Sequence, residues 1–213
     1  MTQFILNTED FSDTAAWTPF DVTITANAQA APAFASPYAR LASNINDPSA
    51  ALQGYLEGVY FSIPNDSQVY TASWHIRKLG SAPSVGAKLG LQLVNGTGVD
   101  HAIEFDAFTG VAANSPVNGG PSSFGVIDLD ALWWRVWYTD SNNSTGNNAM
   151  RPYMAPALTT LPPGTGGESS AGIGSLDIWG ANVTNIATVQ VYASNPLRAA
   201  PFELTRRDSI FIF

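Results

Sequence analysis

Hydrophobic and polar residues alternate along several short stretches of the chain, with the two-residue period that is typical of β-strands. The most aromatic of these stretches is Leu132 to Tyr138 (L-W-W-R-V-W-Y), which contains three of the six tryptophans. In an extended chain, successive side chains point to opposite faces, so Trp133 and Trp137 share one face and Trp134 lies on the other. Both faces are therefore aromatic, and we expect a central strand of a sheet that is covered on both sides.

Further strands are predicted where this alternation returns between turns rich in Gly, Asn, Pro and Ser. Their ranges are Phe4 to Leu6, Val22 to Thr25, Tyr38 to Ala42, Gln53 to Phe61, Val69 to Arg77, Lys88 to Val94, Val99 to Phe105, Ala149 to Ala155, Ser175 to Ala181 and Ala187 to Ala193. Pro152 lacks a backbone N–H and should confine its strand to a sheet edge or a bulge. Because little or no helix is indicated, the sequence predicts an all-β fold, a two-sheet antiparallel β-sandwich (jelly roll) of about eleven strands.

The end of the chain differs from the predicted sandwich. We expect residues 1–184 to form the jelly-roll domain and residues 185–213 to form a C-terminal extension, which ends in the uncharged run S-I-F-I-F. An exposed run with this β-propensity tends to aggregate, so it needs a covering partner. It is either the last strand of its own sandwich or a strand that adds to the sheet edge of a neighbouring subunit. In the second interpretation the contact residues are Ile210, Phe211, Ile212 and Phe213.

Composition and charge argue against several classes of function. The formal net charge is -8, with 17 acidic and 9 basic residues, so the chain lacks the basic surface that nucleic-acid binding needs. The absence of cysteine excludes disulfides, thiolate metal sites and cysteine nucleophiles. The first residues lack the features of a secretion signal, and no apolar run is long enough to span a membrane. We therefore expect a protein that is made in the cytoplasm and does not insert into a membrane.

Few residues are arranged for catalysis. Glu104 and Asp106 lie two positions apart on one strand face, a spacing compatible with paired acid and base work on a glycosidic bond, but also with a solvated acidic face. His75 and His101 are the only histidines, neither has a partner motif, and the G-x-S-x-G motif of serine hydrolases does not occur. We favour the solvated face and predict that the protein is not an enzyme and has no catalytic residues.

Metal and sugar binding are the other candidate chemistries. Asp128 and Asp130 offer the oxygen ligands that calcium prefers, yet calcium needs several more and no dense acidic cluster surrounds the pair. We therefore predict no metal ligands and no cofactor, with a structural calcium ion as the alternative. Aromatic rings can also stack on sugars, because they combine a large apolar face with a polar tip. Most tryptophans should lie in the core, so the candidate glycan contacts are Tyr55 and Tyr60.

Five segments of the chain occur in an order that a known family shares. They are I-L-N-T-E-D-F-S-D-T-A-A-W-T (Ile5 to Thr18), Y-T-x-S-x-x-x-R (Tyr70 to Arg77), F-D-x-x-T-G (Phe105 to Gly110), L-W-W-R (Leu132 to Arg135) and I-W-G-A-N-V (Ile178 to Val183). In this order they resemble a module of tailed-bacteriophage virion proteins, which is itself similar to the jelly rolls of carbohydrate-binding modules. The departures include Trp134, where the family usually has Tyr, and the segment from Asn185 onward, which has no counterpart.

The resemblance implies a location in the virion and a structural or adhesive role, and it supplies no catalytic residues. The expectation is a capsid decoration or head-fibre protein that is displayed in many copies and aids attachment to host-surface glycans. The alternative is a tail-associated receptor-binding adhesin that recognises host polysaccharide. In either case the implied partners are other virion proteins, of the capsid or the tail, and host glycans.

Overall fold

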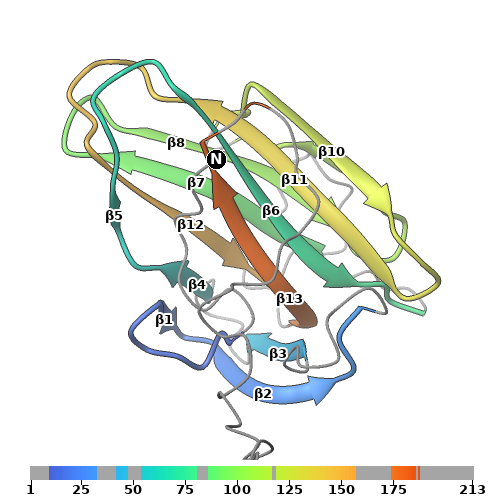
Figure 1. Ribbon diagram of the computed structural model, residues 1–213. Coiled ribbons are helices and arrows are strands. Elements are labelled where there is room, and N and C mark those ends of the chain that lie inside the picture. Colours follow the sequence, from blue (N-terminus) through green and yellow to red (C-terminus); the bar gives the residue numbers. More distant parts are fainter. Residues whose placement is uncertain are drawn as a thin grey trace, which may run out of the picture.

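Two antiparallel β-sheets face each other and enclose the core of the protein (Figure 1). The computed structural model describes residues 10–32, 42–47, 54–80, 86–116, 119–156, 174–185 and 187. Within these residues the chain is all-β, as predicted, because every regular element is a strand. None of these segments forms a helix with the length and apolarity that crossing a bilayer requires.

One sheet has seven strands and the other has six. The seven-stranded sheet consists of β1 (Trp17–Phe20), β4 (Tyr55–Gly58), β5 (Phe61–Ser62), β7 (Gly86–Val94), β8 (Val99–Asp106), β9 (Ala112–Asn114) and β12 (Ala149–Ala155). Its order is β1-β4-β12-β7-β8-β9, and β5 also pairs with β12. The six-stranded sheet consists of β2 (Thr23–Gln29), β3 (Ala42–Asp47), β6 (Val69–Arg77), β10 (Ser123–Asp128), β11 (Trp133–Ser141) and β13 (Gly174–Thr184). Its order is β10-β11-β6-β13-β3-β2.

The predicted β-sandwich is confirmed, and the described residues contain 13 strands where the sequence predicts about eleven. The predicted strand Gln53 to Phe61 is divided into β4 and β5, and the short strands β1, β9 and β10 form where no strand is predicted. Phe4 to Leu6, most of Tyr38 to Ala42 and most of Ala187 to Ala193 lie outside the described residues.

The position of β12 corrects one prediction. This strand lies between β4 and β7 and not at a sheet edge, although it contains Pro152. β5 pairs with the first two residues of β12, and β4 pairs with Tyr153 and Met154, so neither strand pairs with the proline. A Cβ on Gly58 of β4 would lie 2.9 Å from Cδ of Pro152, so the proline ring and its nitrogen face the side of β12 on which β4 and β5 lie. The missing N–H therefore removes no ladder hydrogen bond.

The core between the sheets includes a cluster of three aromatic rings. Trp74 of β6 lies 5.5 Å from Trp17 of β1 and 6.0 Å from Phe11, measured between ring centroids. Each of these side chains is 1% exposed. Burial of one such ring contributes about 4 to 6 kcal/mol before entropy is counted, from ~150–250 Å² at ~25 cal/mol per Å². The cluster thus joins the N-terminal described segment and β1 to the six-stranded sheet.

β11 has the two covered faces that its sequence predicts. Tyr138 belongs to the main core, and Trp134 packs against the same core. Trp133, on the opposite face, is 1% exposed and belongs to a separate small apolar cluster. Arg135 shares the face of Trp133, is 6% exposed and donates a hydrogen bond of 3.2 Å to Oγ of Ser73. The strand is interior, paired with β10 on one side and β6 on the other.

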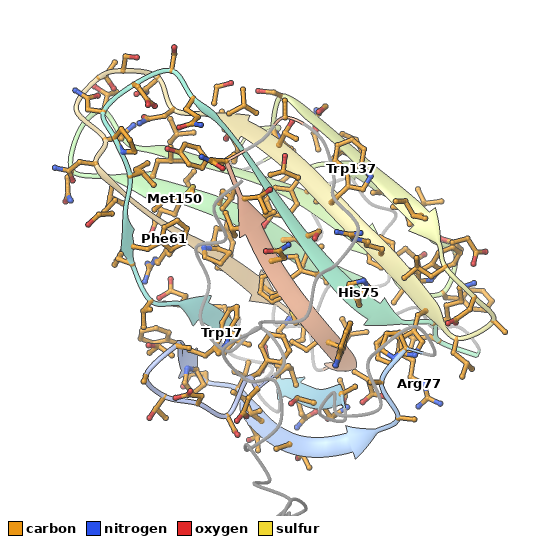
Figure 2. The ribbon with its side chains drawn as sticks, in the orientation of Figure 1. Trp17, Phe61, His75, Arg77, Trp137 and Met150 are labelled. Carbon is orange, nitrogen blue, oxygen red and sulfur yellow. The ribbon has the colours of Figure 1, made fainter. Side chains whose placement is uncertain are left out.

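A buried histidine lies on β6 next to Arg135 in the sheet (Figure 2). His75 is 0% exposed, and its Nδ1 lies 3.3 Å from the carbonyl oxygen of Gly180. Burial, together with the positive charge of Arg135, lowers the pKa of His75 from 6.5 to about 3. The unfolded chain therefore binds one more proton than the folded chain between these two pH values.

We predict that mild acid destabilises the protein through His75. The stability that the neutral side chain contributes is complete above the unfolded pKa and is lost as the pH falls through the interval, by about 2 kcal/mol between pH 7 and pH 5. Urea unfolding at the two pH values should show this loss in the natural chain and in a His101→Gln control, and a much smaller loss in His75→Gln. An equal loss in His75→Gln would assign the acid sensitivity to other groups.

Candidate functional site

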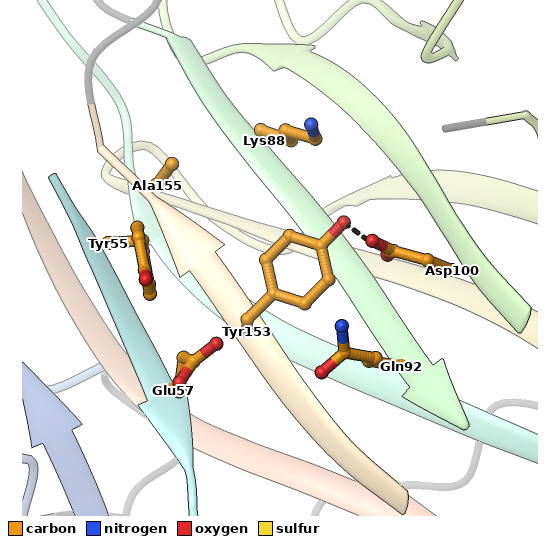
Figure 3. A pocket seen from close by; sticks show the side chains of 7 residues that line it. All are labelled: Tyr55, Glu57, Lys88, Gln92, Asp100, Tyr153 and Ala155. Atoms are coloured by element: carbon orange, nitrogen blue, oxygen red, sulfur yellow. Dashed lines mark hydrogen bonds between the residues drawn. The ribbon is translucent and has the colours of Figure 1, made fainter. Parts of the chain in front are cut away.

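The outward face of the seven-stranded sheet carries a pocket over β4, β12, β7 and β8 (Figure 3). The antiparallel register places Tyr153 of β12 beside Glu57 of β4 on one side and Gly90 of β7 on the other. The pocket has a volume of about 200 Å³ and is lined by Tyr55, Glu57, Lys88, Gln92, Asp100, Tyr153 and Ala155. Four strands that are distant in the sequence thus contribute to one small site.

Tyr153 forms the floor of the pocket because Gly90 has no side chain. A Cβ at position 90 would lie 2.2 Å from Cζ and 2.4 Å from Oη of Tyr153. The ring therefore lies across the backbone of β7, and its hydroxyl donates a hydrogen bond of 2.8 Å to Oδ1 of Asp100 on β8. Figure 3 shows the ring between Lys88 and Gln92, the outward neighbours of the glycine on β7. The result is an aromatic surface that is fixed at both ends.

Arg151 fixes one wall of the pocket through contacts with three neighbours. Its guanidinium forms an ion pair with Glu57, and its Nε donates a hydrogen bond of 2.8 Å to Oε1 of Gln92. The hydroxyl of Tyr60 donates to the same Gln92 oxygen at 2.9 Å, and the guanidinium lies 4.5 Å from the centroid of the Tyr60 ring. These contacts engage the amide oxygen of Gln92 and turn its NH₂ group toward Tyr153 in the pocket (Figure 3).

The second wall is formed by Lys88, and its surroundings correct a prediction. Lys88 is 8% exposed and lies directly opposite Glu104 in the register of β7 and β8. Glu104 is 1% exposed, so the predicted solvated acidic face is wrong at this position. Asp106 lies at the end of β8 and accepts the backbone N–H of Phe108 at 2.8 Å, which stabilises the following turn. The two carboxylates therefore have different structural environments.

Glu57 is the carboxylate of the pocket with a shifted pKa. Burial raises the pKa of Glu57 above its ordinary value, Arg151 acts in the opposite direction, and the charge of Asp100 adds to the increase. The ion pair with Arg151 thus favours the charged form against the effect of burial. Arg151 also fixes the orientation of the Glu57 carboxyl group before a ligand arrives.

Both candidate glycan contacts lie at this face of the sheet. Tyr55 lines the pocket, and its ring stacks on Phe20 of β1 with 4.7 Å between ring centroids. Tyr60 is 47% exposed and is connected to the pocket through its hydrogen bond to Gln92. Tyr55 therefore belongs to the pocket lining, and Tyr60 lies beside it.

Tyr153, which forms the floor, is not among the candidate site residues that the sequence predicts. Tyr153, Gln92 and Asp100 each lie on a strand whose alternation is visible in the sequence, at positions that point away from the core. The signal that identifies the floor is Gly90, a glycine among leucines in an otherwise regular strand. Its meaning depends on the pairing of β12 with β7, which alternation does not specify.

The other candidate residues lie elsewhere. Asp128 forms an ion pair with Nζ of Lys78 at 2.5 Å, and Oδ1 of Asp130 accepts the backbone N–H of Leu132 at 2.7 Å. In the part of the chain that the structure describes, no group of three or more His, Cys, Asp or Glu residues is placed to hold a metal ion. The candidate virion contacts Ile210 to Phe213 lie outside the described residues.

The two histidines also lie outside the pocket, in different environments. His75 on β6 is fully buried. In His101 of β8, the Nδ1 atom is 2.7 Å from Oδ2 of Asp140 on β11. Burial raises the pKa of Asp140, and His101 opposes that shift. This contact joins one sheet to the other, and it explains His101 as a structural residue.

Comparisons with known proteins assign no activity to the chain. No family model and no curated protein matches it. The enzymatically active domain of tailspike protein 4 from bacteriophage CBA120 is similar at a TM-score of 0.49 and 11% identity, over 86% of this chain and 21% of the tailspike chain. This chain therefore spans about a fifth of the length of that tailspike domain.

Two carbohydrate-binding modules are similar over nearly their whole lengths. The CBM22-1 xylan-binding domain of Xyn10C from Paenibacillus barcinonensis has a TM-score of 0.46 and 10% identity, over 88% of this chain and 95% of the module. A family 35 carbohydrate-binding module from Clostridium thermocellum has a TM-score of 0.41 and 13% identity, over 87% of this chain and 100% of the module. At these scores the similarities concern the fold alone.

We predict that Gly90→Ala destabilises the protein by about 1 to 3 kcal/mol, because the new Cβ collides with the Tyr153 ring. Urea unfolding measures the effect, and Gly80→Ala is the matched control because a Cβ there meets no atom within 4 Å. In a Tyr153→Ala background the Gly90→Ala change should have little cost, since the colliding ring is absent. Equal costs in the two backgrounds would contradict the close approach.

Proposed function

We propose that the protein binds saccharides in the pocket over Gly90 and does not transform them. The observation that carries this proposal is the Tyr153 ring, which lies across β7 and is surrounded by hydrogen-bonding side chains on the same face. A sugar ring has an apolar face of C–H groups and a rim of hydroxyls. An aromatic floor with polar walls is complementary to both features.

The walls offer acceptors and donors at the rim of such a sugar. Glu57 and Asp100 supply carboxylate oxygens that accept hydrogen bonds from hydroxyl groups, and Gln92 and Lys88 supply N–H donors. The volume of about 200 Å³ is below the ~300 Å³ at which drug-sized ligand pockets begin, so it suits one sugar unit of a longer chain. The exposed rings of Phe20 and Tyr60 lie beside the pocket, where they offer apolar surface to neighbouring units.

The two carboxylates of the pocket are each held by one partner. Glu57 is ion-paired with Arg151, and Asp100 accepts a hydrogen bond from the hydroxyl of Tyr153. Each is therefore held in a fixed orientation by a partner and keeps further lone pairs free to accept hydrogen bonds. Both are well placed to accept hydrogen bonds from a bound hydroxyl.

The setting that we propose for this binding is a tailed-bacteriophage virion, as a capsid decoration or head-fibre protein displayed in many copies. The resemblance of five sequence segments to a phage virion module supports this setting. Multivalency would make weak saccharide binding effective, because many weak sites on one particle can together hold the particle at a host surface. Other virion proteins and host-surface glycans are the implied partners.

Binding is tested on a glycan array that includes bacterial surface polysaccharides, followed by titration of the strongest ligand. We predict that Tyr153→Ala and Gln92→Ala each weaken binding roughly tenfold or more, since each removes part of the floor or wall. Leu132→Ala is the control, because its exposed side chain lies in the turn before β11 of the other sheet. An array without signal, or full binding by Tyr153→Ala, would contradict the proposal.

The virion setting is tested by immunogold labelling of purified particles of the phage that encodes the protein. Regular labelling of the head is the predicted result. Labelling confined to the tail would replace the decoration role by the alternative, a tail-associated adhesin that recognises host polysaccharide. Unlabelled particles would contradict both assignments.

A further inference from the structure

The charged residues at the pocket are nearly balanced, with one negative charge in excess. Three carboxylates lie on this part of the outward face, on Glu57, Asp100 and Glu104, and two cations lie among them, on Lys88 and Arg151. All five belong to β4, β12, β7 and β8. The pocket therefore contains both signs of charge and no cationic surplus.

Both cations lie next to carboxylates of the protein itself. Arg151 forms the ion pair with Glu57 and donates a hydrogen bond to Gln92, so its guanidinium is already bound to residues of the pocket wall. Lys88 lies directly opposite Glu104 in the sheet, and both side chains are at least nine-tenths buried. An anionic ligand would have to compete with these carboxylates for either cation.

We propose that the pocket selects uncharged sugar units and excludes units that carry a carboxylate, sulfate or phosphate group. This inference rests on the saccharide binding proposed above. A hydroxyl over Tyr153 can donate a hydrogen bond to Asp100, so an uncharged sugar is bound without loss of any contact. An anionic substituent at the same place lies beside that carboxylate in a partly desolvated site, where like charges repel strongly. The net charge of -8 adds long-range repulsion toward a polyanionic chain.

The experiment compares one polysaccharide in two charge states. The neutral polysaccharide that binds best on the array is oxidised at C6 of its hexose units, which converts each hydroxymethyl group to a carboxylate and keeps the backbone. We predict that binding to the oxidised form is roughly tenfold or more weaker than to the parent polymer at low salt. Part of the difference should persist at 0.5 M salt, because charges in a buried site are screened less than exposed ones.

A charge-neutralising variant assigns the selection to the pocket. Asp100→Asn keeps an oxygen that can accept the Tyr153 hydrogen bond and removes the negative charge. The readout is the ratio of the dissociation constants of the oxidised and the parent polymer, which Asp100→Asn should reduce severalfold whatever its effect on the parent polymer alone. Asp177→Asn is the matched control, because it makes the same change of net charge on the six-stranded sheet. This variant should keep the full preference.

The possible failures are distinct. Equal or tighter binding of the oxidised polymer overturns the selection and leaves saccharide binding intact. An unchanged preference in Asp100→Asn overturns the role of this carboxylate, and an equal change in Asp177→Asn assigns the preference to the net charge of the chain. Either result overturns selection by the pocket. An array on which only anionic polysaccharides bind overturns the selection alone, and an array without any ligand overturns the selection together with the proposed function.

Discussion

The close approach of two tyrosines to Gly90, one on each face of the seven-stranded sheet, is the constraint on which the candidate site depends. On the core side, the hydroxyl of Tyr138 from β11 donates a hydrogen bond of 2.7 Å to the carbonyl oxygen of Gly90. On the outward side, the ring of Tyr153 occupies the space that a side chain on this glycine would fill. Because Tyr138 is fully buried and belongs to the other sheet, the backbone under the pocket is tied directly to the core. The backbone beneath the floor is therefore held from both faces of the sheet.

The walls depend on the same sheet register. Glu57, Gln92 and Asp100 come from three strands, and pairing with β12 and β7 brings them around one ring. Arg151 then connects the residues of one wall by an ion pair and a hydrogen bond. A pocket whose polar groups are held before a ligand arrives loses little side-chain entropy on binding. Such preorganisation matters for a small site whose strength, in the proposed setting, comes from many copies.

The sequence predicts the fold class, two-sheet architecture and most strands, because alternation is strong where one face of a strand is buried. Val69 to Arg77 and Ala149 to Ala155 have the same bounds in the structure as in the prediction. Short strands such as β9 are not predicted, because three residues are too few to show the alternation of hydrophobic and polar positions. The prediction for Pro152 is wrong because neither β4 nor β5 pairs with this residue. No hydrogen-bond donor is needed there, just as none is needed at a sheet edge. The pocket was only partly predicted: exposed tyrosines can be guessed from composition, whereas the Tyr153 and Gly90 contact exists only once the strand order is known.

NMR can show whether saccharides bind on the outward face over Gly90. The protein is labelled with ¹⁵N and titrated with a neutral oligosaccharide that corresponds to its best polymer ligand. We expect the largest chemical-shift changes in β7 around Gly90, in β12 around Tyr153 and in β8 around Asp100, with small changes in β2, β3 and β13. Changes centred on the six-stranded sheet would contradict this expectation.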